Sequence, residues 1–301
     1  MQPPPMRAKS ISRRAFVQTA ALTAAAAGAT SLAPAAARAA ELYSVRHGRI
    51  RQSVVPWCFN PMKPQEVVEL AARLKLPAVE LISPDHWPLM KSKGMTCAIA
   101  SSHGFSKGFA HVEEHEECLA NLRKNIALAS DAAVPSIITF SGFRRKLSTE
   151  EGVKNMVAGL KKIAGFAEEK KVTVCLEMLN SRVDVSMKGH PDYFCDDIDL
   201  SVDICKQVGS ERVKVLFDIY HVQIMHGDVI SRLQQHQKWI GHYHTAGVPG
   251  RNEIDDTQEL LYAPIMKAIL ATGYTGFVGQ EFIPLRDKAT SLAEAVRICD
   301  V

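Results

Sequence analysis

The sequence predicts an α/β protein made of one (β/α)8 barrel, the TIM-barrel architecture, on three observations. Short runs rich in β-branched residues alternate with longer amphipathic segments, at about 33 residues per pair, as parallel strands joined by helices do. The segment after the first predicted strand, residues 57–61, lacks the Gly-rich phosphate-binding turn of open doubly wound sheets. No linker or internal repeat divides the 301 residues.

Eight strand–helix units are expected in order along the chain. The strands are the apolar runs at residues 52–59, 78–82, 95–100, 136–140, 172–179, 213–218, 239–245 and 276–282. The helices are the amphipathic segments at residues 64–74, 85–93, 111–132, 149–170, 197–208, 226–237, 261–271 and 289–299. Ser148 is typical of a helix start, and Gly209 stands where the fifth helix is expected to end.

Residues 1–39 have the features of an export signal rather than of a folded domain. The pair Arg13-Arg14 precedes an uncharged stretch at residues 18–37, and Ala37-Arg38-Ala39 suits cleavage by signal peptidase. We therefore expect export by the twin-arginine translocase and a periplasmic barrel of residues 40–301. The alternative is an uncleaved leader that tethers the protein to a membrane, although alanine-rich segments insert weakly.

Charge and cysteine content argue against several classes of protein. The chain carries 36 Lys and Arg against 32 Asp and Glu, but five of the bases and none of the acids lie in residues 1–39. The remainder, with 31 bases against 32 acids, has no basic excess with which to bind nucleic acid. The seven cysteines are odd in number and include no Cys-x-x-Cys pair, so no disulfide framework is expected.

Polar side chains stand at the carboxyl ends of the last four predicted strands, where a (β/α)8 barrel has its active site. These are Glu177, Asp218, His244 and Glu281, and the three acids have apolar neighbours in sequence. Three buried carboxylates with few bases nearby favour a cation. The donor set suits Mn²⁺ or Mg²⁺, with Zn²⁺ or Co²⁺ as alternatives. Taken singly, each acid could instead cap a helix or pair with a Lys or Arg.

Four blocks of sequence over these strands are distinctive: residues 176–180 (LEMLN), 217–228 (FDIYHVQIMHGD), 240–251 (IGHYHTAGVPGR) and 273–282 (GYTGFVGQEF). Together they resemble the hydroxypyruvate isomerase family, which belongs with the ketose 3-epimerases to the xylose-isomerase-like barrels. The resemblance is specific over residues 172–285 and looser before them.

The resemblance implies a role for six residues. The metal ligands would be Glu177, Asp218, His244 and Glu281, the acid/base pair Glu177 and Glu281, and the substrate-binding residues His221 and Arg251. Two features depart from the isomerases of the family. His244 stands where they often have Gln and related epimerases have His, and residues 252–258 differ from their Gly-containing loop. The substrate therefore stays open.

The two substrate-binding candidates also have other interpretations. Arg251 follows a Pro-Gly turn, and its planar guanidinium suits a substrate carboxylate, but it could be a surface arginine paired with Glu253 or Asp255. His221 could cap a helix or support a neighbouring side chain instead of contacting substrate.

Several other aromatic and histidine residues have no assigned role. Loop positions that could reach the pocket are Trp57, His86, His103 and His190. His111 and His115 have the spacing of a metal-binding pair, but the glutamates around them favour a solvated helix face.

The predicted function is a metal-dependent isomerase of the aldose–ketose type. It would convert hydroxypyruvate to tartronate semialdehyde through a metal-stabilised enediolate, with glutamates as acid and base. The alternatives are a ketose 3-epimerase, a glycoside-cleaving enzyme that uses the two glutamates as a carboxylate pair, and a non-catalytic exported barrel that binds a sugar acid. A small hydroxy-keto acid or keto sugar is the expected partner, and a homo-oligomer is left open.

Overall fold

Eight parallel strands form the centre of the protein in a computed structural model that describes residues 41–301. The predicted signal peptide at residues 1–39 lies outside this part of the chain. The strands are β1 (Arg51–Val54), β2 (Ala78–Val79), β3 (Thr96–Cys97), β4 (Ser136–Thr139), β5 (Thr173–Glu177), β6 (Val213–Asp218), β7 (Ile240–Thr245) and β8 (Phe277–Gln280). Each overlaps one predicted strand, so the (β/α)8 fold is confirmed.

The eight strands join into a ring. Six follow the order β1-β8-β7-β6-β5-β4, and the other two pair as β2-β3, all parallel. Backbone hydrogen bonds link the two sheets, because the N–H of Glu80 donates to the carbonyl of Val54 and that of Ala100 donates to Ser136. The carboxyl ends of the strands therefore face one end of the barrel, and adjacent strands bring their terminal residues together.

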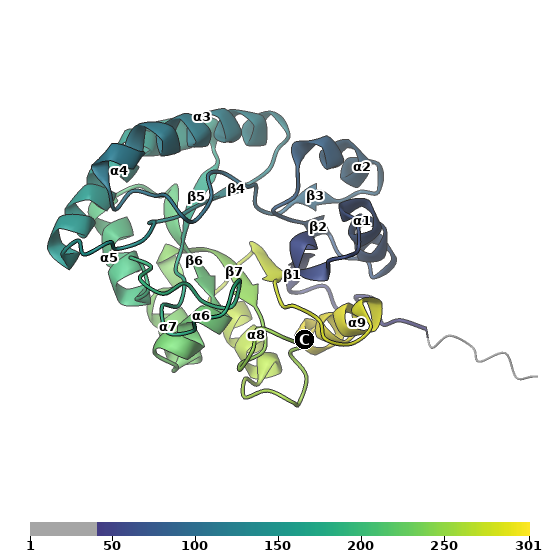
Figure 1. The fold of residues 1–301 in the computed structure, drawn as a ribbon. Coiled ribbons are helices and arrows are strands. Elements are labelled where there is room, and N and C mark those ends of the chain that lie inside the picture. Colours follow the sequence, from purple (N-terminus) through teal and green to yellow (C-terminus); the bar gives the residue numbers. More distant parts are fainter. Residues whose placement is uncertain (1–40) are drawn as a thin grey trace, which may run out of the picture. The chain divides into compact units, whose positions relative to one another are not determined.

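In the described chain, nine α-helices lie outside the strands (Figure 1). They are α1 (Pro64–Arg73), α2 (Trp87–Ser92), α3 (His115–Asp131), α4 (Thr149–Lys170), α5 (Ile198–Val208), α6 (Ile219–Met225), α7 (Val229–Gln235), α8 (Tyr262–Ala271) and α9 (Lys288–Cys299). As expected, the Ser148 hydroxyl caps α4 by accepting a hydrogen bond from the N–H of Glu151. Gly209 ends α5 with a left-handed φ of 76°.

Strand β1 is shorter than predicted, because it ends at Val54 rather than at residue 59. Pro56 has no N–H to donate to a neighbouring strand, and it begins a short 3₁₀ helix, Pro56–Phe59. Trp57 therefore projects from a turn at the barrel end and not from a strand.

A short helix that the sequence analysis did not predict, α6, follows β6 without a loop. The carboxylate of Asp218 accepts hydrogen bonds from the N–H groups of Tyr220 and His221 at 2.8 and 3.2 Å, and so caps this helix. The helix expected at residues 226–237 corresponds to α7 alone, and α6 precedes it as an additional helix. As a consequence, His221 lies in the first turn of α6, beside Asp218.

Apolar side chains fill the space between the strands and the helices in one continuous core. All seven cysteines are buried in it with free thiols, as their scattered positions predicted. Within residues 41–301, no helix combines the length and apolar character that crossing a membrane requires.

Candidate metal centre and active site

The four predicted metal ligands meet at the carboxyl end of the barrel. Glu177 ends β5, Asp218 ends β6, His244 lies in β7 and Glu281 directly follows β8. Because these strands are neighbours in the sheet, the side chains converge. All four are at most 4% exposed, and one donor atom from each lies within 4.8 Å of the others.

The distances within this cluster suit ligands that surround one ion. Nδ1 of His244 lies 2.8 Å from Oε2 of Glu281, 3.4 Å from Oε1 of Glu177 and 4.0 Å from Oδ2 of Asp218. Neither Nδ1 of His244 nor Oε1 of Glu177 makes a hydrogen bond with any residue in the described range. Buried polar atoms without partners are costly, so this donor set fits a divalent cation.

The charges in the cluster push the pKa values of its two glutamates apart. Burial and the charge of Glu281 raise the pKa of Glu177, and burial raises the pKa of Asp218 to about 7. Burial also opposes ionisation of Glu281, but Arg251 and His244 outweigh it and hold the pKa of Glu281 at about 2. The raised pKa values reflect burial first and the neighbouring carboxylates second, and a bound cation would favour the ionised form of both groups.

Arg251 is the positive charge next to this cluster. It has a left-handed backbone φ of 58° and a guanidinium that is fully buried. Nη2 donates to Oε2 of Glu281 and lies 3.5 Å from Oδ2 of Asp218, while Nη1 donates to the carbonyl of Met187 at 2.7 Å. Three ionised carboxylates and one guanidinium have a net charge of −2, which a divalent cation would balance.

These contacts exclude one alternative for Arg251. It is not a surface residue paired with Glu253 or Asp255, because those acids contact Arg286 instead. Nη1 and Nη2 each donate one hydrogen bond within the protein, and Nε has no hydrogen-bond partner among the described residues, so N–H groups remain for a ligand. The stiff loop turns the side chain inward, where the guanidinium also lies 5.3 Å from the ring centroid of Trp57.

His221 is held as a neutral imidazole with its N–H directed into the cluster. Nδ1 accepts a hydrogen bond from the backbone N–H of Asn180 at 2.9 Å, so the proton of the ring lies on Nε2. Nε2 is 3.6 Å from Oδ2 of Asp218. Burial and the nearby charge of Arg251 lower the pKa of His221 well below its ordinary value.

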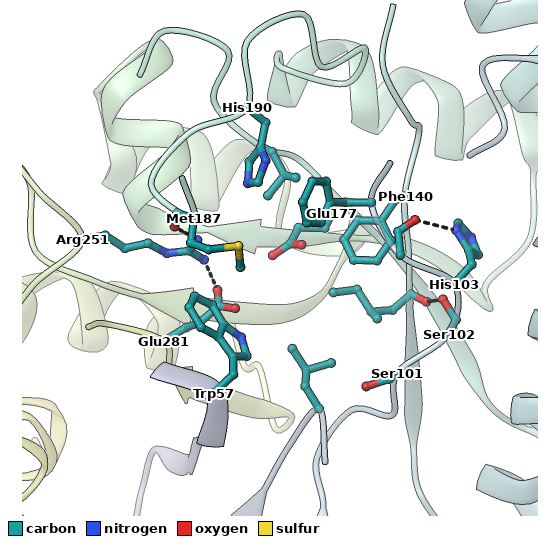
Figure 2. Close-up of a pocket in the computed structure, with 15 residues that line it drawn as sticks. Trp57, Ser101, Ser102, His103, Phe140, Glu177, Met187, His190, Arg251 and Glu281 are labelled. Atoms are coloured by element: carbon teal, nitrogen blue, oxygen red, sulfur yellow. Dashed lines mark hydrogen bonds and ion pairs between the residues drawn. The ribbon is translucent and has the colours of Figure 1, made fainter. Parts of the chain in front are cut away.

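A cavity of about 280 Å³ opens beside the cluster. Figure 2 shows Arg251, Met187 and Glu281 on one side of it, Phe140 and His103 on the other, and Glu177 between them. The remaining wall residues are Trp57, Leu81, Ser101, Ser102, Gly104, Phe105, Ile138, Leu179 and His190. The wall is more apolar than polar, as in most sites for small molecules.

The loop between β5 and α5 covers this cavity. The carbonyl of Met187 is bound by Arg251, and that of Lys188 accepts hydrogen bonds from Asn180 and Tyr220 at 2.9 and 2.7 Å. His190, on the same segment, packs against Phe105 with 4.4 Å between the ring centroids and an angle of 59° between the ring planes, and it lines the cavity. Burial and the charge of Arg251 lower the pKa of His190 to about 4.

Trp57, His103 and His190, which the sequence left unassigned, thus line the cavity, whereas His86 does not. His111 and His115 contact the backbone carbonyls of Phe143 and Phe109, respectively. Neither histidine belongs to a group of described residues that could hold a metal ion. His115 is buried rather than solvated, because its Nε2 is used inside the fold.

Glu80, which was not predicted as a site residue, is a fully buried carboxylate that lies 2.8 Å from His242 and 3.2 Å from His244. Burial opposes its ionisation, but the positive potential of the two histidines lowers its pKa. The spacing of His242 and His244 could have indicated such a residue, because residues two apart in a strand lie on the same face and can share one partner.

Comparison with known proteins identifies the family. Residues 66–299 match the family described as "Xylose isomerase-like TIM barrel". The chain belongs to this family. Membership in the xylose isomerase-like barrels, expected from the four sequence blocks, is therefore confirmed.

Two curated relatives of this barrel carry the names of isomerases. The chain is 40% identical over 121 residues to the 2-oxo-tetronate isomerase of Cupriavidus necator, which covers 40% of the chain and 44% of that protein. It is 26% identical over 192 residues to the hydroxypyruvate isomerase of Escherichia coli, which covers 64% of the chain and 67% of that protein. The first match spans less than half the length of the relative.

A solved structure supports the same fold. The structure described as AP endonuclease, family 2, from Brucella melitensis superposes with a TM-score of 0.72 at 24% identity, over 81% of this chain and 98% of the other. At this identity the likeness concerns the fold alone.

Proposed function

We propose that this barrel is a metal-dependent isomerase that moves a proton between neighbouring carbons of a small hydroxy-keto substrate. The observation that carries the proposal is the buried cluster of Glu177, Asp218, His244 and Glu281 beside a cavity that both glutamates line. A divalent cation held by these four residues, Mn²⁺ or Mg²⁺ by the donor chemistry and otherwise Zn²⁺ or Co²⁺, would stabilise the negative charge that develops on the substrate oxygens.

Glu177 and Glu281 are the acid/base pair in this proposal. One carboxylate removes the proton from the carbon next to the carbonyl, which leaves an enediolate. In an isomerisation the proton returns to the neighbouring carbon, while the hydroxyl proton passes to the former carbonyl oxygen. In an epimerisation the second glutamate delivers a proton to the opposite face of the same carbon. Environments that push two carboxyl pKa values apart, as around Glu177 and Glu281, suit such a division of roles.

His221 and Arg251 orient these reacting groups. The neutral Nε2–H of His221 can donate to a substrate oxygen without adding positive charge. Arg251 holds Glu281 ionised and fixes the position of its carboxylate. Met187 and His190 line the cavity on the side of the loop between β5 and α5 and would contact a bound substrate.

The substrate is either hydroxypyruvate, converted to tartronate semialdehyde, or a longer neutral ketose epimerised at C3. The names of the two relatives favour an acid. One observation favours the ketose. The cavity, at about 280 Å³, has room for roughly nine water molecules, more than a three-carbon acid fills.

Proton NMR in D₂O tests the activity. The metal-loaded protein, offered hydroxypyruvate, tartronate semialdehyde and several ketoses, should introduce deuterium at the carbon next to the carbonyl of one of them. A chelator should stop the exchange, and Mn²⁺ or Mg²⁺ should restore it, which also separates this activity from that of a metal-free glycosidase. Glu177→Gln and Glu281→Gln should each slow the exchange by about 10²–10⁴-fold. Binding of a substrate without any exchange would favour the non-catalytic barrel.

We also propose that residues 1–39 direct export of the folded barrel to the periplasm. The support is the Arg13-Arg14 pair followed by the uncharged stretch. Replacement of both arginines by lysine should leave the full chain in the cytoplasm on cell fractionation. A periplasmic double variant would contradict the twin-arginine route.

A further inference from the structure

A second buried carboxylate lies behind the candidate metal cluster. Glu80 follows β2, and its side chain is fully buried. Its Oε2 accepts a hydrogen bond from the hydroxyl of Ser53 at 2.9 Å and lies 2.8 Å from Nε2 of His242. Its Oε1 lies 3.2 Å from Nε2 of His244. One carboxylate therefore contacts both histidines of β7.

His244 thus has carboxylates at both ring nitrogens. Glu80 faces Nε2, while Glu177 and Glu281 face Nδ1. A neutral imidazole carries its proton on one nitrogen and can bind a metal only through the other. The negative charge of Glu80, next to Nε2, favours the proton on that nitrogen. The lone pair of Nδ1 is then directed at the three carboxylates of the cluster.

The barrel is shaped to hold Glu80 in this place. A Cβ atom on Gly279 of β8 would lie 1.7 Å from Oε1 of Glu80, so glycine at this position is what lets the carboxylate lie against the strand. Ser53 and His242 contact the other oxygen. Neither Glu80 nor His242 is among the described residues that line the cavity, so their place is behind the ligands rather than against the substrate.

We propose that Glu80 is a positioning residue that fixes the proton of His244 on Nε2 and thereby sets Nδ1 as a metal ligand. The inference rests on the metal centre of the proposed function. Such partners of metal-bound histidines raise the basicity of the ligand, and their loss typically costs 10–100-fold in metal affinity.

Titration calorimetry on the full-length, metal-free chain tests this role without measuring activity. Glu80→Gln keeps the side-chain shape and removes the charge. The matched control is Glu114→Gln, since Glu114 is also a buried carboxylate but its partners are the N–H of Gly108 and the side chain of Arg145. With Mn²⁺, wild type and Glu114→Gln should bind one ion with equal affinity, and Glu80→Gln should bind it about 10–100-fold more weakly.

Nitrogen NMR of the zinc-loaded, ¹⁵N-histidine-labelled chain gives a second readout. In wild type, Nε2 of His244 should carry a slowly exchanging proton, and that exchange should accelerate in Glu80→Gln.

Three results would overturn the proposal in different ways. Equal affinities of wild type and Glu80→Gln would remove the positioning role and leave the metal centre intact. Two ions per wild-type chain, one of them lost in Glu80→Gln, would make Glu80, His242 and His244 ligands of a second ion. A wild-type chain that binds no ion would contradict the metal centre itself, and the positioning role would fall with it.

Discussion

The charge balance of the cavity depends on single residues, and above all on Arg251. It is the one cation of the described cavity wall, apart from the histidines, and it contacts Glu281, Asp218 and the loop that covers the site. A buried ion pair stabilises a fold weakly, but removing one partner leaves an uncompensated charge at a high cost.

Arg251→Met should therefore destabilise the metal-free protein by about 3–5 kcal/mol and, at the same time, raise its affinity for Mn²⁺, because a positive charge next to the ion is lost. Urea unfolding and calorimetry measure the two effects. Arg286→Met is the control, since the Arg286 side chain is half exposed and pairs with Asp255 and Glu294. A variant with unchanged stability and unchanged metal affinity would mean that Arg251 does not balance the cluster.

The raised pKa values predict how pH acts on the metal-free protein. Burial raises the pKa of Asp218 to about 7, and it also raises the pKa of Glu177 above its ordinary value. Each contributes stability that is present at low pH and lost as pH rises through the folded pKa, and the raised pKa of His244 acts in the same direction. With a chelator present, urea unfolding should show lower stability at pH 8 than at pH 5.5. Saturating Mn²⁺ should remove or reverse this trend, and a metal-free protein that gains stability between these pH values would contradict it.

Among the elements, the loop between β5 and α5 connects the candidate metal ligands to the cavity wall. It runs from Glu177 through Asn180, which positions His221, to Met187 and His190, which cover the substrate space. Its path is tight, because a Cβ on Gly189 would lie 2.1 Å from the carbonyl oxygen of Val183.

Gly189→Ala should displace this covering segment and raise KM on the order of tenfold or more, with a smaller effect on the cluster itself. Steady-state kinetics with the substrate found by deuterium exchange measures it. Gly165→Ala is the matched control, because Gly165 lies in α4 with nothing within 4 Å of the added methyl group. Equal KM values for the two variants would show that the segment does not shape the site.

The convergence of the four candidate ligands was predictable from the sequence because it depends on one rule, that parallel strands bring their carboxyl ends together. Features that depend on local backbone geometry or on residues distant in the sequence were not predictable in this way. Pro56 ended β1 early, and the cap at Asp218 created α6. Glu80 was missed because its partners, His242 and His244, lie more than 160 positions along the chain and meet it only in the closed ring.

For the whole barrel, one residue near the end of the chain fastens the segment before β1. The carboxylate of Asp300 accepts hydrogen bonds from the hydroxyl of Tyr43 at 2.7 Å and from the backbone N–H groups of Arg46, His47 and Gly48 at 2.6, 3.0 and 2.8 Å. These bonds link residues more than 250 positions apart and join the segment before β1 to the segment after α9.

Asp300→Ala should lower the free energy of unfolding by about 2–3 kcal/mol, because several charge-assisted hydrogen bonds are lost together. Deuterium exchange at saturating metal and substrate should be unchanged, since Asp300 does not line the cavity. Urea unfolding checks the first value, and a loss of activity in the folded variant would contradict the second.

Anomalous diffraction from crystals of the protein soaked in Mn²⁺ would show whether Glu177, Asp218, His244 and Glu281 together hold one divalent cation. We expect a single strong peak at about 2.0–2.3 Å from one donor atom of each of these side chains, and no peak in Asp218→Asn. A cluster that stays without a peak at saturating Mn²⁺, its carboxylates neutralised by Arg251 and protons alone, would contradict this expectation.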